Sequence, residues 1–283
     1  METLELLITL MAKKYKLGIF VEAGGNMVFF SNGVLKALKK RNIKANYIAG
    51  FSSSAAIMFG YILDCNDFIL EDFKIKLNNN KKNFYFFKKE HFPHNQIYKS
   101  SVEKIFLNFG RNALCFDTDF TVIAAITSKK WIWAKGLSAS LILLLRNIGI
   151  DIRRYFNKAC KIKLFEAGSE FKNKTEELIN IIIGSSCLWP FIKLHFWKDK
   201  LVLDGGLVYS SYKKYLEQCE KGIVIHTDRG KTSVRNNILH FYASQDVPFN
   251  VLDYTDGSKL EIMHEAGERE VFANQKLLDD FIG

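Results

Sequence analysis

The stretch LGIFVEAGGN, residues 17–26, decides the fold class of this chain, because an apolar run leads directly into a glycine loop. A short continuous apolar run of this kind is typical of a buried strand. From Ser31 the apolar residues recur at helical spacing, and basic residues crowd the end of that segment. YIAG at residues 47–50 predicts a second strand, and residues 53–63 predict a buried helix. Strand, loop, helix, strand and helix in this order open an α/β sheet.

The rest of the chain extends this pattern. Apolar runs predict further strands at residues 121–127, 201–203 and 222–226, and a last one from Val251. Helical patterns occur at residues 173–183, where Asn173 precedes Glu176 as in a capping box, and at residues 259–281. We therefore expect an α/β fold, a three-layer α/β/α sandwich with a mainly parallel central sheet. In this interpretation residues 1–283 form a single domain, and residues 66–170 are a candidate insertion, lid or membrane-contact region within it.

The composition describes a globular chain with a basic excess. Of its 283 residues 48% are hydrophobic, which excludes global disorder. The formal net charge of +10 favours an anionic partner, either a nucleic acid or a membrane surface. The five cysteines include no CxxC pair, so neither a disulfide framework nor a zinc site is expected, and a reducing compartment is the simplest interpretation. No cofactor and no metal ion are predicted.

The sequence predicts neither a signal peptide nor a membrane-spanning helix. The apolar run from Leu4 to Met11 has no basic region before it, and Glu2 and Glu5 lie beside and within it. No uncharged apolar stretch reaches the roughly 18 residues that a membrane span requires. We expect a cytoplasmic protein whose contact with a membrane, if any, is peripheral.

GFSSS at residues 50–54 follows the second predicted strand and resembles the G-x-S-x-G turn, with serine in place of the last glycine. In that turn the middle serine, here Ser52, projects its hydroxyl at the carboxyl edge of the sheet. The next helix points its amide N–H groups at the same place. A strand–helix junction without catalysis uses the same small residues, so the motif alone leaves both interpretations open.

Two glycine motifs accompany this turn. AGGN at residues 23–26 lets the backbone approach a bound group, as in a phosphate site, an oxyanion hole or a plain tight turn. The dinucleotide fingerprint G-x-G-x-x-G and the phosphate-loop G-K-[ST] are absent. DGG at residues 204–206 follows a predicted strand, so Asp204 is expected at the carboxyl edge of the sheet, where ligands collect. An ordinary turn is the alternative.

Taken together and in this order, the motifs resemble those of the patatin-like phospholipases. The resemblance is carried by EAGG at residues 22–25, GVLKAL at 33–38, GFSSSAA at 50–56 and DGGL at 204–207. SSCLWPF at residues 185–191 is similar to the segment of small residues and proline that precedes the aspartate strand in that family. The similarity lies in discrete blocks between residues 17 and 207, and residues 66–170 contain no matching motif.

The resemblance implies a serine lipid acyl hydrolase with a Ser–Asp dyad and a phospholipid or other acyl-ester lipid as substrate. Ser52 would be the nucleophile and Asp204 the general base that takes its proton. The backbone amides of Gly24, Gly25 and Asn26 would form the oxyanion hole.

The glycine loop departs from the family pattern G-G-G-x-R-G. Ala23 replaces the first glycine, Met27 replaces the arginine and its positive charge, and Val28 replaces the last glycine. Ser54 replaces the last glycine of the serine motif. A narrower substrate range, slower turnover or a catalytically impaired lipid-binding protein on the same fold would each fit these changes.

A soluble Ser-His-Asp esterase is a further alternative, because His226, His240 and His264 all follow Asp204. In that fold, however, the nucleophile usually follows several strands, whereas Ser52 lies very early in the chain. His226 lies within an apolar strand and is expected to be structural.

Residues 131–163 combine tryptophans, an apolar run and basic residues, which suits an interfacial element or a lid on a transient anionic membrane surface. A core helix followed by a solvated basic face is the alternative. FYFFKK at residues 84–89 is a second candidate contact. Interleaved aromatic and basic residues can also bind single strands. No nucleic-acid-binding motif accompanies them, so no nucleic-acid partner is expected.

Overall fold

The computed structural model describes residues 13–87, 91–110, 117–147, 149–243 and 252–283. The apolar run from Leu4 to Met11 lies outside these residues, as does Val251. The last strand predicted from Val251 is wrong for the described residues 252–257, which form turns and irregular backbone before α10. The strands are β1 (Tyr15–Val21), β2 (Tyr47–Phe51), β3 (Asp119–Ser128), β4 (Lys163–Ala167), β5 (His195–Trp197), β6 (Lys200–Leu203), β7 (Cys219–Arg229), β8 (Ser233–Arg235) and β9 (Ile238–Ala243). The α-helices are α2 (Val28–Lys40), α3 (Ser53–Leu63), α4 (Asn66–Asn78), α5 (His94–Phe109), α6 (Ile132–Asn147), α7 (Arg153–Ala159), α8 (Thr175–Ser185), α9 (Lys213–Leu216), α10 (Ser258–Ala273) and α11 (Gln275–Ile282).

The strands form one nine-stranded sheet in the order β5-β6-β3-β2-β1-β7-β9-β8, with β4 also paired to β3. The five central strands, β3, β2, β1, β7 and β9, run parallel. The outer strands pair antiparallel: β4 and β6 with β3, β5 with β6, and β8 with β9. The prediction of an α/β fold with a parallel sheet at its centre is confirmed. The loops after β1 and β2 therefore meet at one carboxyl edge.

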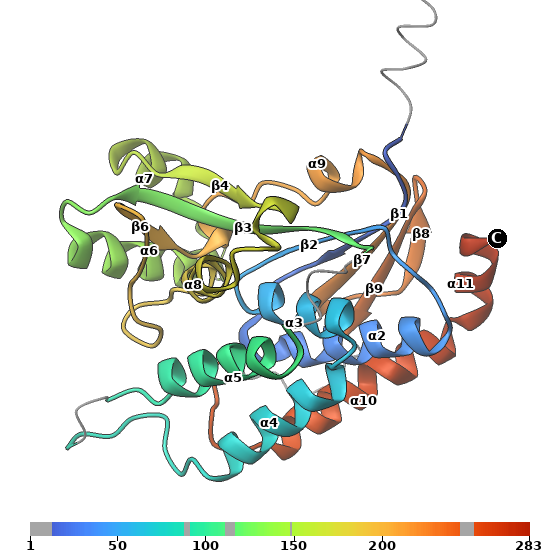
Figure 1. The fold of residues 1–283 in the computed structure, drawn as a ribbon, viewed down its shortest axis with the longest axis horizontal. Coiled ribbons are helices and arrows are strands. Elements are labelled where there is room, and N and C mark those ends of the chain that lie inside the picture. Colours follow the sequence, from blue (N-terminus) through green and yellow to red (C-terminus); the bar gives the residue numbers. More distant parts are fainter. Residues whose placement is uncertain (1–12, 88–90, 111–116, 148, 244–251) are drawn as a thin grey trace, which may run out of the picture.

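Helices cover both faces of this sheet (Figure 1). Because successive side chains of a strand point to opposite faces, Ile19 and Val21 of β1 join a large buried cluster with α2, α3, α5, α8 and α10. Phe20 points the other way and packs against Tyr209 and Tyr215, next to α9. A third cluster on that face holds α6 and α7 against β3 and β6. The carboxyl ends of the central strands therefore lie between the helices of the two faces.

Several local expectations need correction. The first helix begins at Val28 rather than Ser31. The N-cap of α8 is Lys174, not Asn173, and its side chain makes no capping bond. The predicted C-terminal helix is interrupted at Asn274, which separates α10 from α11. In the described part of the chain, no helix has the length and apolar character needed to cross a bilayer.

Candidate active site

Ser52 lies at a strained turn between β2 and α3. Its backbone has φ 56° and ψ −138°, a conformation that non-glycine residues adopt at a cost of roughly 1–3 kcal/mol. The turn is held from outside, because the Ser52 N–H donates to Ser185 Oγ at 2.8 Å and Ser185 Oγ donates to the Ile123 carbonyl at 2.7 Å. Such a strained strand-to-helix turn is the geometry that exposes the nucleophile in G-x-S-x-G enzymes.

Ser54 explains why this turn does without its last glycine. Its side chain is fully buried, and its hydroxyl accepts a hydrogen bond from the Phe51 N–H at 3.0 Å. The same hydroxyl can donate to the carbonyl of Val21 at 2.8 Å or of Phe51 at 2.7 Å. The serine thus ties the turn to the end of β1, a contact that glycine could not make.

Replacing Ser54 by alanine is expected to lower the free energy of unfolding by about 1–3 kcal/mol, because the buried Phe51 N–H loses its acceptor. Urea unfolding followed by circular dichroism measures this difference. Ser31→Ala is the matched control, since the Ser31 hydroxyl is equally buried and has no hydrogen-bond partner among the described residues. Equal losses of stability in the two variants would contradict the role given to Ser54.

The glycine loop after β1 lies beside this turn. Gly25 has φ 54°, which favours glycine, and it begins a 3₁₀ turn that ends at Met27. In the described ranges no protein acceptor is found for the N–H groups of Gly24 and Gly25. Val28 is already helical, with φ −60° and ψ −15°, so a glycine is not needed at that position. The loop is anchored by Thr227, whose hydroxyl donates to the Ala23 carbonyl at 2.7 Å.

Asp204 reaches the same place by a route that differs from the prediction. β6 is antiparallel to β3, with Leu203 opposite Ala125, so the strand returns toward the end of β2. Gly205 has to be glycine, because a Cβ there would lie 2.3 Å from the Ile123 carbonyl oxygen and 2.7 Å from Phe51 Cβ. This close approach brings the aspartate to the strained serine turn.

The Asp204 carboxyl is buried and hydrogen bonded. One of its oxygens accepts from the Gly206 N–H at 2.7 Å, and the Ser52 side chain lines the same cavity beside it. Burial raises the pKa of Asp204 to about 6, although the nearby Ser52 side chain, the hydrogen bond from the Gly206 N–H and the charge of Arg146 act in the opposite direction. A carboxylate with a pKa of about 6 is mostly ionised at neutral pH and basic enough to take a proton from an alcohol in a reaction.

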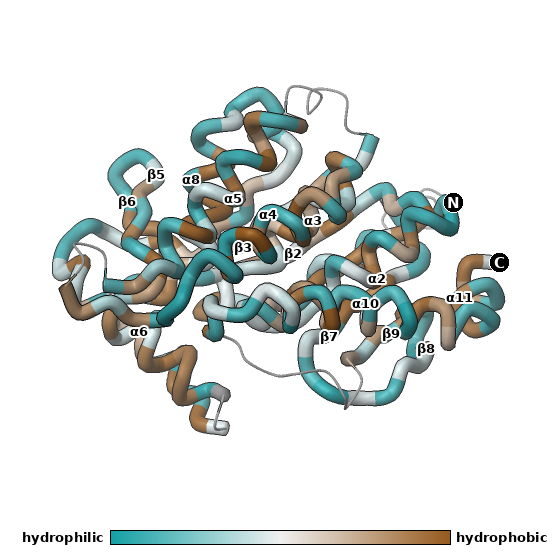
Figure 2. The backbone as a smooth tube through the Cα atoms, turned by 90° about the horizontal axis from the view of Figure 1, so that it is seen from below, coloured by the Kyte–Doolittle hydropathy of each residue, from teal (hydrophilic) through white to brown (hydrophobic). Residues whose placement is uncertain are grey.

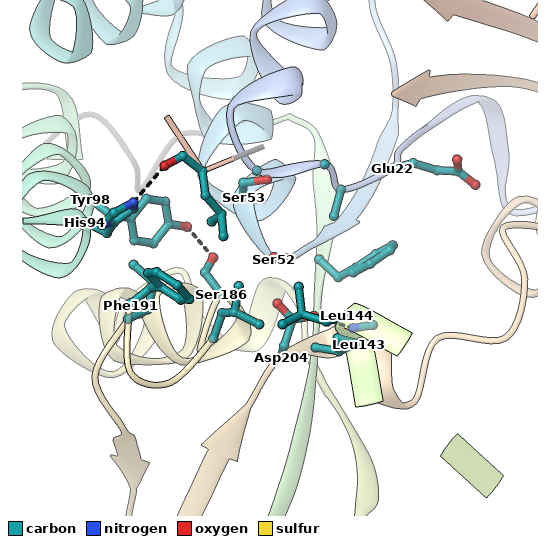
Figure 3. A pocket seen from close by; sticks show the side chains of 18 of the residues that line it. Glu22, Ser52, Ser53, His94, Tyr98, Leu143, Leu144, Ser186, Phe191 and Asp204 are labelled. Atoms are coloured by element: carbon teal, nitrogen blue, oxygen red, sulfur yellow. Dashed lines mark hydrogen bonds between the residues drawn. The ribbon is translucent and has the colours of Figure 1, made fainter. Parts of the chain in front are cut away.

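A cavity of about 270 Å³ joins these groups (Figure 3). Ser52, Asp204, Gly24 and Gly25 all line it, whereas Asn26 is not among the lining residues. The Asn26 side chain instead donates to the Asp253 carbonyl at 2.6 Å. The remainder of the lining is mostly apolar: Phe51, Tyr98, Leu143, Leu144, Leu188, Phe191, Ile192, Tyr209, Leu252 and Tyr254. The cavity therefore combines a polar centre with walls that suit a hydrocarbon chain.

The three histidines of the triad alternative lie elsewhere. Among the described residues that line the cavity, none of His226, His240 and His264 appears. The Nδ1 of His226 lies 2.9 Å from Glu22 Oε2, and its Nε2 lies 2.9 Å from His240 Nδ1. The Nδ1 of His264 lies 3.2 Å from the side-chain nitrogen of Asn32, a residue of α2. The structure therefore gives no support to a Ser-His-Asp triad built from these residues.

The ligating atoms of Glu22, His226 and Asp228 also lie within 4.8 Å of one another, an arrangement that a cation could use. A hydrogen bond between His226 and Glu22 already explains why these groups lie close together, so no cation is needed to account for the arrangement.

Two residues of the cavity were missed by the sequence analysis. Arg146, near the end of α6, adds a positive charge to the lining. In the sequence, the only indication of such a role was that Arg146 is a single charged residue within an apolar run. His94 lines the opposite wall and donates from Nε2 to the Leu252 carbonyl at 2.9 Å, and burial lowers its pKa (Figure 3). Nothing in the sequence around His94 indicates that the first residue of α5 would face Ser52 across the cavity.

Comparison with known proteins gives little further information. No protein-family model matches the chain, and no curated protein matches its sequence. Among solved structures, VipD from Legionella pneumophila is similar over 91% of this chain and 67% of that chain, with 9% sequence identity and a TM-score of 0.37. A likeness of this degree carries no conclusion about activity, so the function has to be inferred from the site.

Proposed function

We propose that this protein is a lipid acyl hydrolase, a phospholipase A-type esterase with a patatin-like fold and a Ser52–Asp204 dyad. The observation that carries the proposal is that the strained Ser52 and the buried Asp204 line one largely apolar cavity beside the glycine loop, with the Ser52 side chain close enough to lower the pKa of the carboxyl. The motif order that resembles the patatin-like phospholipases supports the same function.

The chemistry follows from these positions. Asp204 takes the proton of Ser52 Oγ while Oγ bonds to the acyl carbonyl carbon, and the carbonyl electron pair moves onto oxygen. The free N–H groups of Gly24 and Gly25 stabilise that oxyanion, each contributing about 2.7–4 kcal/mol in comparable enzymes. When the ester C–O bond breaks, Asp204 returns the proton to the departing alcohol. Water then attacks the acyl-enzyme with Asp204 again as the base, which releases the fatty acid.

The departures from the family pattern are compatible with this activity. Met27 cannot supply the positive charge that the family places near the loop, but Arg146 brings one into the same cavity from α6. Its charge lowers the pKa of Asp204 and so keeps part of the carboxyl ionised despite burial. Arg146 would therefore favour the form of Asp204 that acts as a base.

Labelling with a fluorophosphonate probe tests the proposal. The probe is expected to modify the protein at Ser52, located by mass spectrometry of the labelled peptide, because only an activated serine reacts readily with it. Acyl release from a short water-soluble ester and from mixed phospholipid vesicles is expected in the same preparation. A folded protein that is neither labelled nor able to release acyl chains would instead be the catalytically impaired lipid-binding protein of the alternative interpretation.

A further inference from the structure

The helix α6 leaves one apolar face largely exposed to solvent. Trp133, Leu137, Leu141 and Leu144 are 61%, 53%, 55% and 44% exposed, and their spacing of four, four and three residues places them on one side of the helix. Just before the helix, Trp131 is 81% exposed. In Figure 2 most of the tube at α6 has the brown colour of apolar residues. A continuous exposed apolar face of this kind marks an interaction site.

The opposite face of α6 packs against the core. Ala139 and Ile142 are buried in a cluster with β3 and β6, and Phe156 of α7 packs against the same cluster. Both helices therefore pack on the same face of the sheet, and the exposed leucines can change without loss of this core.

The segment that contains α6 and α7 is rich in positive charge. Residues 129–165 hold nine lysines and arginines and a single acidic residue, Asp151, whereas the whole chain has a net charge of +10. Asp151 is already paired with Arg153 at 2.7 Å. Exposed basic residues of this segment without an ion pair in the described ranges include Lys130, Arg154, Lys158, Lys161 and Lys163. The segment from residue 129 to residue 165 therefore exposes both apolar and strongly cationic side chains.

The apolar face leads into the cavity. Leu144 belongs to the exposed face and also lines the cavity, and Leu143 and Arg146 line it from the same end of α6. At about 270 Å³ the cavity lies below the usual range of about 300–1,000 Å³ for ligand pockets. It has room for part of a lipid, so the remainder of a bound lipid would lie along the surface next to α6.

We propose that the exposed face of α6, with the basic residues of and after α7, docks on an anionic lipid bilayer. Tryptophans and leucines suit the interfacial region, and the basic residues suit anionic headgroups. A second copy of this chain would bring the same cationic segment against itself, which disfavours a dimer through this face. The role of docking rests on the proposed function: it would place the mouth of the cavity at the membrane, where an acyl-ester lipid can enter.

Vesicle binding by the full chain carrying Ser52→Ala tests docking without any hydrolysis. Co-sedimentation is expected to show at least about ten-fold tighter binding to vesicles with about 30 mol% phosphatidylglycerol than to pure phosphatidylcholine, and to weaken as salt is added. Because Trp131 and Trp133 are the most exposed tryptophans described, quenching of fluorescence by brominated lipid is expected, and a Trp131→Phe/Trp133→Phe variant should lose most of it.

Two variants and two matched controls locate the surface. Leu137→Glu/Leu141→Glu and Arg154→Glu/Lys158→Glu/Lys161→Glu are each expected to weaken binding at least about 20-fold, since one basic residue contributes about 1 kcal/mol, or five-fold, near an anionic surface. The controls are Leu107→Glu/Phe272→Glu and Lys44→Glu/Lys231→Glu/Lys276→Glu, which change similarly exposed residues elsewhere. Circular dichroism and melting temperatures verify that every variant is folded.

The proposal is overturned if anionic vesicles do not bind, or if the controls weaken binding as much as the α6 and α7 variants. If the protein does not bind vesicles but forms a dimer, and this dimer dissociates in Leu137→Glu/Leu141→Glu, the face would instead bind a second copy of the chain. These outcomes are independent of the esterase, whose failure would appear as absent acyl release from a soluble ester while vesicle binding persists.

Discussion

Ser52→Ala is expected to abolish acyl release, with a fall in kcat/KM of about 10⁴–10⁶-fold, because the group that forms the covalent intermediate is removed. The variant should fold normally. The hydrogen bond that holds the turn uses the backbone N–H of residue 52, and alanine retains it. Hydrolysis of a short chromogenic ester, followed at enzyme concentrations high enough to detect the residual rate, gives the fold-change directly.

Ser53→Ala is the control that makes this result specific. The Ser53 hydroxyl belongs to the next residue of the same cavity lining and has no hydrogen-bond partner among the described residues. Its removal is expected to change the rate by less than about ten-fold, since the hydroxyl takes no part in the chemistry. Comparable losses in the two variants would mean that the cavity needs its hydroxyls for binding, and Ser52 would no longer be the nucleophile.

The strand, turn and helix around Ser52 could be predicted from the sequence, because neighbouring residues specify each of them. The apolar run before residue 22, the strand before Ser52 and the helix after it are specified by adjacent residues, and α3 spans the predicted residues 53–63. Turn chemistry is equally local, and Gly25 has the positive φ that such loops reserve for glycine.

The direction of the strands and the contacts between residues distant in the sequence could not be predicted from the sequence. An apolar run has the same appearance in a parallel and an antiparallel pair, so the reversed direction of β6 was invisible. The Ser54 hydroxyl can donate to the carbonyl of Val21, which lies 33 residues away in the sequence. Arg146 reaches the cavity only because α6 packs across β6, a contact that no local pattern reports.

Asp204→Asn is expected to lower kcat by about 10³–10⁴-fold and, at the same time, to raise the free energy of unfolding at neutral pH by about 1–3 kcal/mol. Asparagine cannot take the proton of Ser52, which explains the loss of rate. It also removes a charge that the fold buries at a cost, as the rise of the Asp204 pKa from 3.8 to about 6 indicates. In the wild type, kcat is expected to rise with pH around this pKa, because the base must be ionised.

The pH dependence of stability separates this explanation from a general improvement in packing. Below about pH 4 the Asp204 carboxyl is neutral in both the folded and the unfolded chain, so it costs the wild type little. Between pH 4 and 6 the unfolded chain loses its proton first, which favours unfolding, and above pH 6 the cost is constant. The difference between Asp204→Asn and wild type should therefore be small near pH 4, grow up to pH 6 and then stay level in urea unfolding experiments.

Asp72→Asn supplies the matched control with the opposite sign. Asp72 is about as buried as Asp204, but its hydrogen bonds to Lys104, Lys76 and Ser101 hold its pKa below the usual value. Its charge therefore stabilises the fold above the ordinary pKa of an aspartate, and this stability is lost as the pH falls. Asp72→Asn should destabilise the protein at pH 7 and approach wild type in acid. A difference for Asp204→Asn that does not vary with pH would show that the carboxyl is not held at a raised pKa, and the base would have to be sought elsewhere in the cavity.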